Sequence, residues 1–124
     1  MSFPNIDQII NNQERFFRSN KTRSQIFRLQ QLEKLKKTII KYEDDIIEAC
    51  AKDMGKPEQE AYQSEVLQSL SHIRYMQKNL SKLIKPQKRK LPLGHYPGKT
   101  YTIAEPYGRI LIISPWNYPF QLAI

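Results

Sequence analysis

The sequence predicts a mainly α-helical chain that ends in a β hairpin and in one strand of the kind found inside α/β proteins. Through residues 4–80, apolar side chains recur every three or four positions, as on one face of an amphipathic helix. After Pro86 the pattern changes to prolines, glycines and alternation, and residues 110–113 are apolar without a break. A strand that is apolar on both faces is typical of a sheet covered on both sides.

Two helices are expected in the first third of the chain. Residues 4–18 carry a broken apolar face. Thr22-Arg23-Ser24-Gln25 has the spacing of a capping box, in which the Thr22 hydroxyl and the Gln25 amide each reach a free backbone N–H. The stripe expected on the core face of the helix that follows comprises Ile26, Leu29, Leu32, Leu35 and Ile39.

Two more helices follow. The acids at residues 43–45 favour a helix N-terminus, because the helix dipole is positive there. Gly55 is expected to end this third helix, and Pro57 suits the first turn of a fourth, over about 57–80. The core face expected for the fourth helix comprises Val66, Leu67, Leu70, Ile73, Met76 and Leu80.

The chain beyond Pro86 is predicted to be loop and strand. Residues 86–98 hold three prolines and two glycines, which indicate a loop. Residues 100–103 alternate like a half-exposed strand, and Pro106-Tyr107-Gly108 turns the chain toward residues 110–113.

The apolar strand at 110–113 also bears on completeness. It needs neighbouring strands and covering helices, which the last residues cannot supply, and a single hairpin is marginal in water. We therefore expect a fragment of a larger protein in three parts. Residues 1–85 are helical, 86–108 form a loop and bridging β-strands, and 109–124 hold a strand and a truncated elbow.

The net charge of +8 requires an explanation. A cluster without a carboxylate comprises Lys82, Lys85, Lys88, Arg89, Lys90 and Lys99. It could bind phosphates in a salt-dependent manner. A solvated linker, or a surface facing acidic parts of a larger protein, is the preferred interpretation, because no nucleic-acid module accompanies the cluster. No apolar run is long enough to cross a membrane. The single cysteine excludes an internal disulfide and suits a cytoplasmic location.

Asn117 is the strongest candidate for chemistry. Its side-chain amide offers two N–H donors without charge. Held between Pro115 and Pro119 at a strand end, it could donate to an oxygen that gains negative charge during acyl transfer, a contribution of about 3–4 kcal/mol. The alternative is an asparagine that merely forms a turn.

Other polar residues carry weaker indications. Cys50 lies on an apolar helix face among acids, so we interpret it as a small core residue and not as a nucleophile. His72 and His95 have no second ligand at metal spacing, and we expect no metal site. Glu58 and Tyr62 lie one helical turn apart and could line a pocket, although such a pair is more often ordinary surface.

One segment resembles a known family. Glu105-Pro106-Tyr107-Gly108, followed by Ile112-Ile113-Ser114-Pro115-Trp116-Asn117-Tyr118-Pro119, looks like the start of the cofactor domain of the aldehyde dehydrogenases, in their class 3 branch. Asp53-Met54-Gly55-Lys56 with Glu65-Val66, and the run from Lys85-Pro86 to Lys99, resemble the same branch. The resemblance covers essentially the whole chain and implies an α/β fold with a Rossmann-type cofactor domain.

The resemblance also implies an activity. In such enzymes a cysteine thiolate attacks an aldehyde, hydride passes to NAD+ or NADP+, and a glutamate activates the water that releases the carboxylic acid. By position Asn117 would be one donor of the oxyanion hole. The residues implied to line the cofactor cleft are Ile113, Ser114, Pro115 and Trp116. Those implied to border the aldehyde entrance are Tyr118, Tyr62 and Glu58.

Residues 1–124 do not contain the nucleophilic cysteine or the general-base glutamate, which lie downstream in the family. We therefore expect this chain to be inactive alone and the full-length protein to be a homodimer without specific nucleic-acid binding. Two alternatives stay open. One is a basic helical module that binds nucleic acid or an acidic membrane, and the other is a complementing fragment of a split enzyme.

Overall fold

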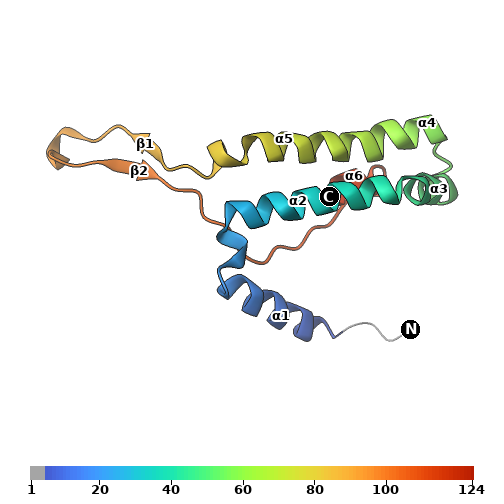
Figure 1. The fold of residues 1–124 in the computed structure, drawn as a ribbon, viewed down its shortest axis with the longest axis horizontal. Helices are drawn as coiled ribbons and strands as arrows, with labels where there is room; N and C mark the ends of the chain where they lie inside the picture. The colour runs from blue at the N-terminus through green and yellow to red at the C-terminus, as the bar shows by residue number, and fades with distance from the viewer. Residues whose placement is uncertain (1–4) are drawn as a thin grey trace.

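The computed structural model describes residues 5–124. The chain forms a helical body from which a β hairpin projects (Figure 1). The helices are α1 (Ile6–Arg18), α2 (Gln25–Lys41), α3 (Glu43–Met54), α4 (Glu58–Ala61), α5 (Gln68–Leu83) and α6 (Pro119–Ala123). A π-helical turn, Tyr62–Leu67, joins α4 to α5, and single 3-10 turns lie at Lys21–Arg23 and Leu93–His95. The strands are β1 (Gln87–Arg89) and β2 (Thr100–Thr102).

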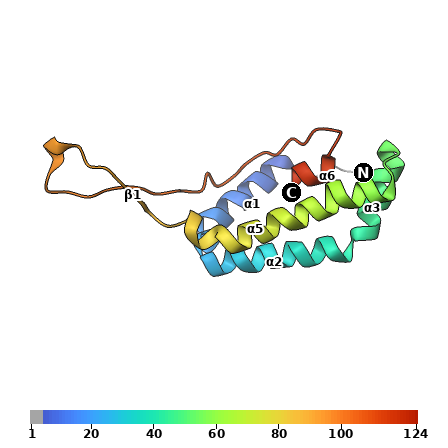
Figure 2. The same cartoon turned by 90° about the horizontal axis from the view of Figure 1, so that it is seen from above.

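The core lies between α2 and α5, which run side by side along the body (Figures 1 and 2). Its buried residues are Ile39, Val66, Leu70 and Ile73. Leu32, Leu35, Ile46, Ile47 and Phe120 pack against them, so that α3 and α6 close the same cluster. Phe120 brings the end of the chain onto a core built mostly from the first two thirds of the sequence.

The predicted helices are present, with three differences. The helix start expected at residue 4 lies outside the described residues, and α1 begins at Ile6 behind the Asn5 side chain, which accepts from the backbone N–H of Asp7. The fourth helix is longer than expected and contains the π turn. Part of the predicted core is solvated, since Ile26 is 69% exposed and Leu67 and Met76 are also exposed.

The start of α2 corrects the capping-box prediction. Ser24, not Thr22, is the N-cap, and its hydroxyl accepts from the Phe27 backbone N–H at 3.3 Å. Thr22 lies in the preceding 3-10 turn, where its hydroxyl oxygen is buried without a partner among the residues described. The helix therefore starts later, because the extended backbone that an N-cap requires occurs at Ser24.

The expected end of α3 is confirmed. Glu43, Asp44 and Asp45 occupy the first turn, and Gly55 terminates the helix with a φ of 64°. Glycine adopts this left-handed conformation without the penalty that a Cβ atom brings.

The hairpin projects from one end of the helical body (Figures 1 and 2). β1 and β2 pair antiparallel with Lys88 opposite Tyr101, and every residue in both strands is exposed. The second strand lies where residues 100–103 were expected to be extended. Its partner, β1, comes from residues 86–98, where the prolines and glycines indicated a loop within the region of the expected bridging strands.

The buried strand expected at residues 110–113 does not form in this structure. These residues run as an irregular segment that pairs with no strand in the described chain, and Ile113 is 84% exposed. A strand needs hydrogen-bonded neighbours, and the two short strands here bond only to each other. The assignment of this segment to a cofactor-domain sheet stays a prediction.

Candidate functional site

The Trp-Asn-Tyr elbow lies against the turn that joins α3 to α4. The Nζ atom of Lys56 donates to the backbone oxygen of Asn117 at 3.1 Å and lies 4.5 Å from the centre of the Tyr118 ring. The anchor on Asn117 is therefore its backbone. Residue 117 is exposed, and within the described chain its side-chain amide has no hydrogen-bond partner.

A buried ion pair holds this anchor. Lys56 Nζ lies 2.6 Å from Glu65 Oε1, and the two side chains are 7% and 0% exposed. The other carboxylate oxygen of Glu65 accepts from the backbone N–H of Gln121 at 2.9 Å. Both oxygens of Glu65 are used, which offsets the cost of removing a carboxylate from water.

The buried glutamate lies in the π turn. Glu65 and its neighbour Val66 are both fully buried there. The Ser69 hydroxyl donates to the backbone oxygen of Glu65 at 2.7 Å and supports the turn. Single π turns occur frequently at functional sites.

Beside the elbow lies a hollow of about 320 Å³. Its lining residues are Met54, Gly55, Lys56, Pro57, Glu60, Trp116, Asn117 and Tyr118. Three of the predicted site residues, Trp116, Asn117 and Tyr118, therefore meet there.

The other predicted site residues do not line this hollow. Ile113, Ser114 and Pro115 precede it on the chain, and Glu58 and Tyr62 lie on the adjoining helical segment. Tyr62 is partly exposed, at 37%.

Sequence reasoning gave no role to Lys56, Glu60 or Glu65. A buried ion pair nine positions apart, from the Gly55-Lys56-Pro57 turn to the π turn, has no sequence signal, since the usual helical pairs are three or four apart. The closest indication was the charge of Glu65 next to the apolar run that begins at Val66.

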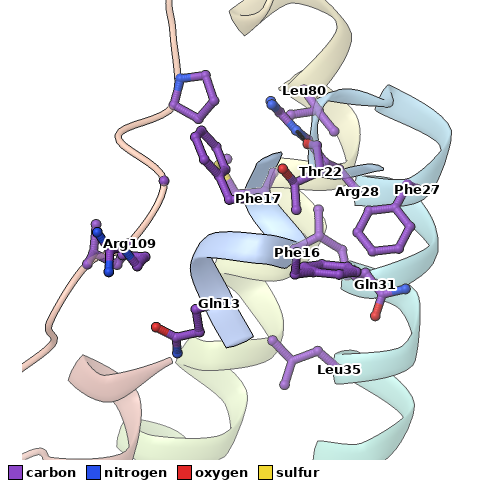
Figure 3. Close-up of a pocket in the computed structure, with 15 residues that line it drawn as sticks. Gln13, Phe16, Phe17, Thr22, Phe27, Arg28, Gln31, Leu35, Leu80 and Arg109 are labelled. Carbon is purple, nitrogen blue, oxygen red and sulfur yellow. Dashed lines mark hydrogen bonds between the residues drawn. The ribbon is translucent and has the colours of Figure 1, made fainter. Parts of the chain in front are cut away.

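A second, larger hollow of about 630 Å³ lies between α1, α2, α5 and residues 106–110 (Figure 3). Its walls are mainly aromatic and aliphatic, with Phe16 and Phe27 at a ring-centre distance of 5.9 Å. Arg109 closes one side through a 2.9 Å ion pair with Glu14. Its mainly apolar walls suit the packing of α1 against residues 106–110, which lead to the elbow.

Cys50 is the core residue that the sequence predicted. It is buried, and desolvation, followed by the nearby charge of Glu65, raises the pKa of its thiol. It faces Phe120 and Pro119 in a separate hollow of about 510 Å³, not the hollow that contains Asn117. No group of three or more His, Cys, Asp and Glu side chains in residues 5–124 could hold a metal ion. No helix of that range is both long and apolar enough to span a bilayer.

Comparison with known proteins decides the family. A sequence model described as "Aldehyde dehydrogenase family" matches residues 2–124. The chain belongs to the aldehyde dehydrogenase family. Its relatives include members of family 3, so this aldehyde dehydrogenase chain is of the class 3 type that its motifs resemble.

Two relatives and one solved structure show the extent of the similarity. The chain is 43% identical over 117 residues to the 4,4'-diaponeurosporen-aldehyde dehydrogenase of Staphylococcus aureus, covering 94% of this chain and 26% of that protein. It is 42% identical over 108 residues to aldehyde dehydrogenase family 3 member A2 of Rattus norvegicus, covering 87% and 22%. The structure "Substrate bound state of Staphylococcus Aureus AldH" matches with a TM-score of 0.90 and 42% identity, over 97% of this chain and 26% of that one.

The chain thus spans about a quarter of the length of the curated relatives it matches. The match to a solved aldehyde dehydrogenase confirms the predicted fold family, with helices and a two-stranded ribbon in this segment.

Proposed function

We propose that this chain is the N-terminal segment of an NAD(P)+-dependent aldehyde dehydrogenase that oxidises an aldehyde to a carboxylic acid, with Asn117 as an oxyanion donor. The observation that carries the proposal is the state of Asn117 in a chain of this family. Its backbone oxygen is held by Lys56, and its side-chain amide makes no hydrogen bond within residues 5–124 and lies at the edge of a hollow. An amide in that arrangement can donate to substrate without first giving up a protein partner.

The amide contributes by charge stabilisation. When a thiolate attacks an aldehyde carbonyl, the carbonyl oxygen becomes an oxyanion. A neutral N–H donor placed at that oxygen stabilises the transition state more than the ground state, by about 3 kcal/mol. Lys56 contributes no donor to the oxyanion in this arrangement, since its bonds are used inside the protein.

The residues before Asn117 fit one part of a dinucleotide. Residues 113–116 present an exposed aliphatic and aromatic surface, with Trp116 at 85% exposure, together with the half-buried Ser114. Such a surface suits a planar ring. We assign this stretch to the cofactor side, where NAD+ or NADP+ would accept the hydride. The described chain contains no glycine-rich loop for the phosphates.

Residues 1–124 are proposed to be inactive by themselves, because no thiolate faces Asn117. Cys50 is buried, its thiol pKa is raised, and it lines a different hollow. A nucleophilic cysteine and a general-base glutamate must come from chain outside these residues.

The remaining assignments concern substrate and assembly. We place Tyr118 toward the aldehyde because it lines the hollow with Asn117. Tyr62 and Glu58, which lie on the adjoining helical segment, are proposed to border the aldehyde entrance. A canine relative is described as "dimeric NADP-preferring" and is 36% identical, which supports a dimeric assembly and the use of NADP+. That the dimer is a homodimer is part of the proposal. A cytoplasmic location is part of the proposal.

The test is substitution of Asn117 in the protein isolated from its source, with whatever chain follows residue 124. Asn117→Ala should lower kcat for aldehyde-dependent reduction of NAD+ or NADP+ by about 100-fold or more. The matched control, Asn11→Ala, removes an exposed amide from α1 and should leave kcat unchanged. Wild-type kcat in Asn117→Ala would overturn the role of this amide, and the absence of aldehyde-dependent reduction in the wild type would overturn the activity.

A further inference from the structure

We infer that the buried Lys56–Glu65 pair is a positioning device that fixes the elbow so that the Asn117 amide points out toward substrate. The inference rests on the proposed role of Asn117. It assigns a positioning role to Lys56, just before α4, and to Glu65, in the π turn. Neither residue would touch the substrate, and both would act through the backbone of the elbow.

The pair makes hydrogen bonds to the elbow backbone on both sides of Pro119. Lys56 holds the backbone oxygen of Asn117, 61 positions away in sequence, and Glu65 holds the backbone N–H of Gln121, 56 positions away. The N–H of Gln121 lies in the first turn of α6, where no intrahelical acceptor exists. The elbow backbone is therefore held at the Asn117 carbonyl before α6 and at the Gln121 N–H in the first turn of α6.

Proline further restricts the segment between the two contacts. Pro119 lies between the two contacts and has a fixed φ, which removes one rotatable bond from this short segment, and Pro115 restricts the chain in the same way two residues before Asn117. With the Asn117 carbonyl turned inward to Lys56, its side chain is the part that is left to face the hollow.

Lys56 is fully engaged in this role. Its Nζ donates to Glu65 Oε1 at 2.6 Å, to Asn117 O at 3.1 Å and to Ser64 Oγ at 3.5 Å, which accounts for all three N–H groups. The Tyr118 ring covers the same atom at 4.5 Å.

Stability alone gives no reason for an ion pair here. Apolar side chains of similar volume often replace a buried pair without loss of stability. What charged groups add is direction, since only a donor and an acceptor can specify which way the Asn117 carbonyl and the Gln121 N–H point. The device is thus expected to affect kcat far more than folding.

The test compares the apolar double variant Lys56→Met/Glu65→Leu with the control Lys52→Met in the protein isolated or expressed at its natural length. Lys52 makes an exposed ion pair with Glu48 on α3, so its substitution removes a lysine but no hydrogen bond to the elbow. The double variant should fold, lose hydrogen-exchange protection at the Gln121 amide, and show a fall in kcat of about 10- to 100-fold with little change in KM for the cofactor. Lys52→Met should fold and keep the wild-type exchange protection of the Gln121 amide, the wild-type kcat and the wild-type KM for the cofactor.

A double-mutant cycle separates positioning from a general structural effect. If Lys56 and Glu65 act through Asn117, adding their substitution to Asn117→Ala should lower kcat no further, because the donor is already absent. Equal, additive losses in the two backgrounds would overturn the inference, as would unchanged kcat in a folded Lys56→Met/Glu65→Leu protein whose Gln121 amide exchanges freely. An Asn117→Ala protein with wild-type kcat would instead disprove the proposed function on which the inference rests.

Discussion

Lys56 and Asn117 are joined by a 3.1 Å hydrogen bond from the lysine Nζ to the asparagine backbone oxygen, although 61 positions separate them in sequence. This bond links the N-terminal helices to the elbow that carries the family motif. It makes the geometry of the elbow depend on the turn between α3 and α4, which lies far from the elbow in sequence.

Removal of one partner of the buried pair should destabilise the fold. Glu65→Ala leaves the Lys56 ammonium buried without its counter-charge, and we expect the free energy of unfolding in urea to fall by about 3–5 kcal/mol. Glu48→Ala, which breaks an exposed pair on α3, should change it by less than about 1 kcal/mol. Similar values for the two variants would contradict the burial seen at Glu65.

The start of α2 can be tested with two neighbouring hydroxyls. Ser24→Ala removes the acceptor for the Phe27 N–H and should lower stability by about 1 kcal/mol. Thr22→Val removes a buried hydroxyl oxygen that has no partner in the described structure. The midpoint temperature of thermal unfolding should therefore stay unchanged or rise. The reverse order of effects would restore Thr22 as the cap.

A side chain at Gly108 should be destabilising. Its φ is 92°, and a Cβ atom there would lie 3.0 Å from the Phe17 ring. Gly108→Ala should therefore destabilise the contact between α1 and the segment before the elbow by about 1–2 kcal/mol, measured by denaturant unfolding. Gly94→Ala is the matched control, because open space surrounds that glycine and its φ is not positive.

Cys50 should behave as a buried thiol. Desolvation is the main cause that raises its pKa, so alkylation by iodoacetamide near pH 8 should be slow in the folded chain and fast in urea. Its stabilising contribution is present below the ordinary thiol pKa, because folded and unfolded chains are then both protonated. It is lost as the pH rises toward the higher folded pKa, because the unfolded thiol ionises first. Rapid labelling of the folded chain at neutral pH would contradict the structure.

The apolar periodicities predicted the number and order of the main helices, and Gly55 and the acids at residues 43–45 marked α3 correctly. These features succeed because they depend on neighbours three or four positions away. The same reasoning failed at Ile26 and Leu67, where exposure depends on which other elements cover a face. Residues 110–113 pair with no strand in the described chain, and their place in a cofactor-domain sheet stays a prediction.

The elbow shows the same division. Its Pro-Trp-Asn-Tyr-Pro pattern identified the family and singled out Asn117, because proline geometry and amide chemistry are local properties. The Lys56–Glu65 pair forms where the π turn packs against the turn before α4, and the contacts to Gln121 and to the Asn117 backbone form where the end of the chain packs against both. Hydrogen bonds across 56 and 61 positions leave no periodic trace in the chain, so only tertiary structure could place these groups together.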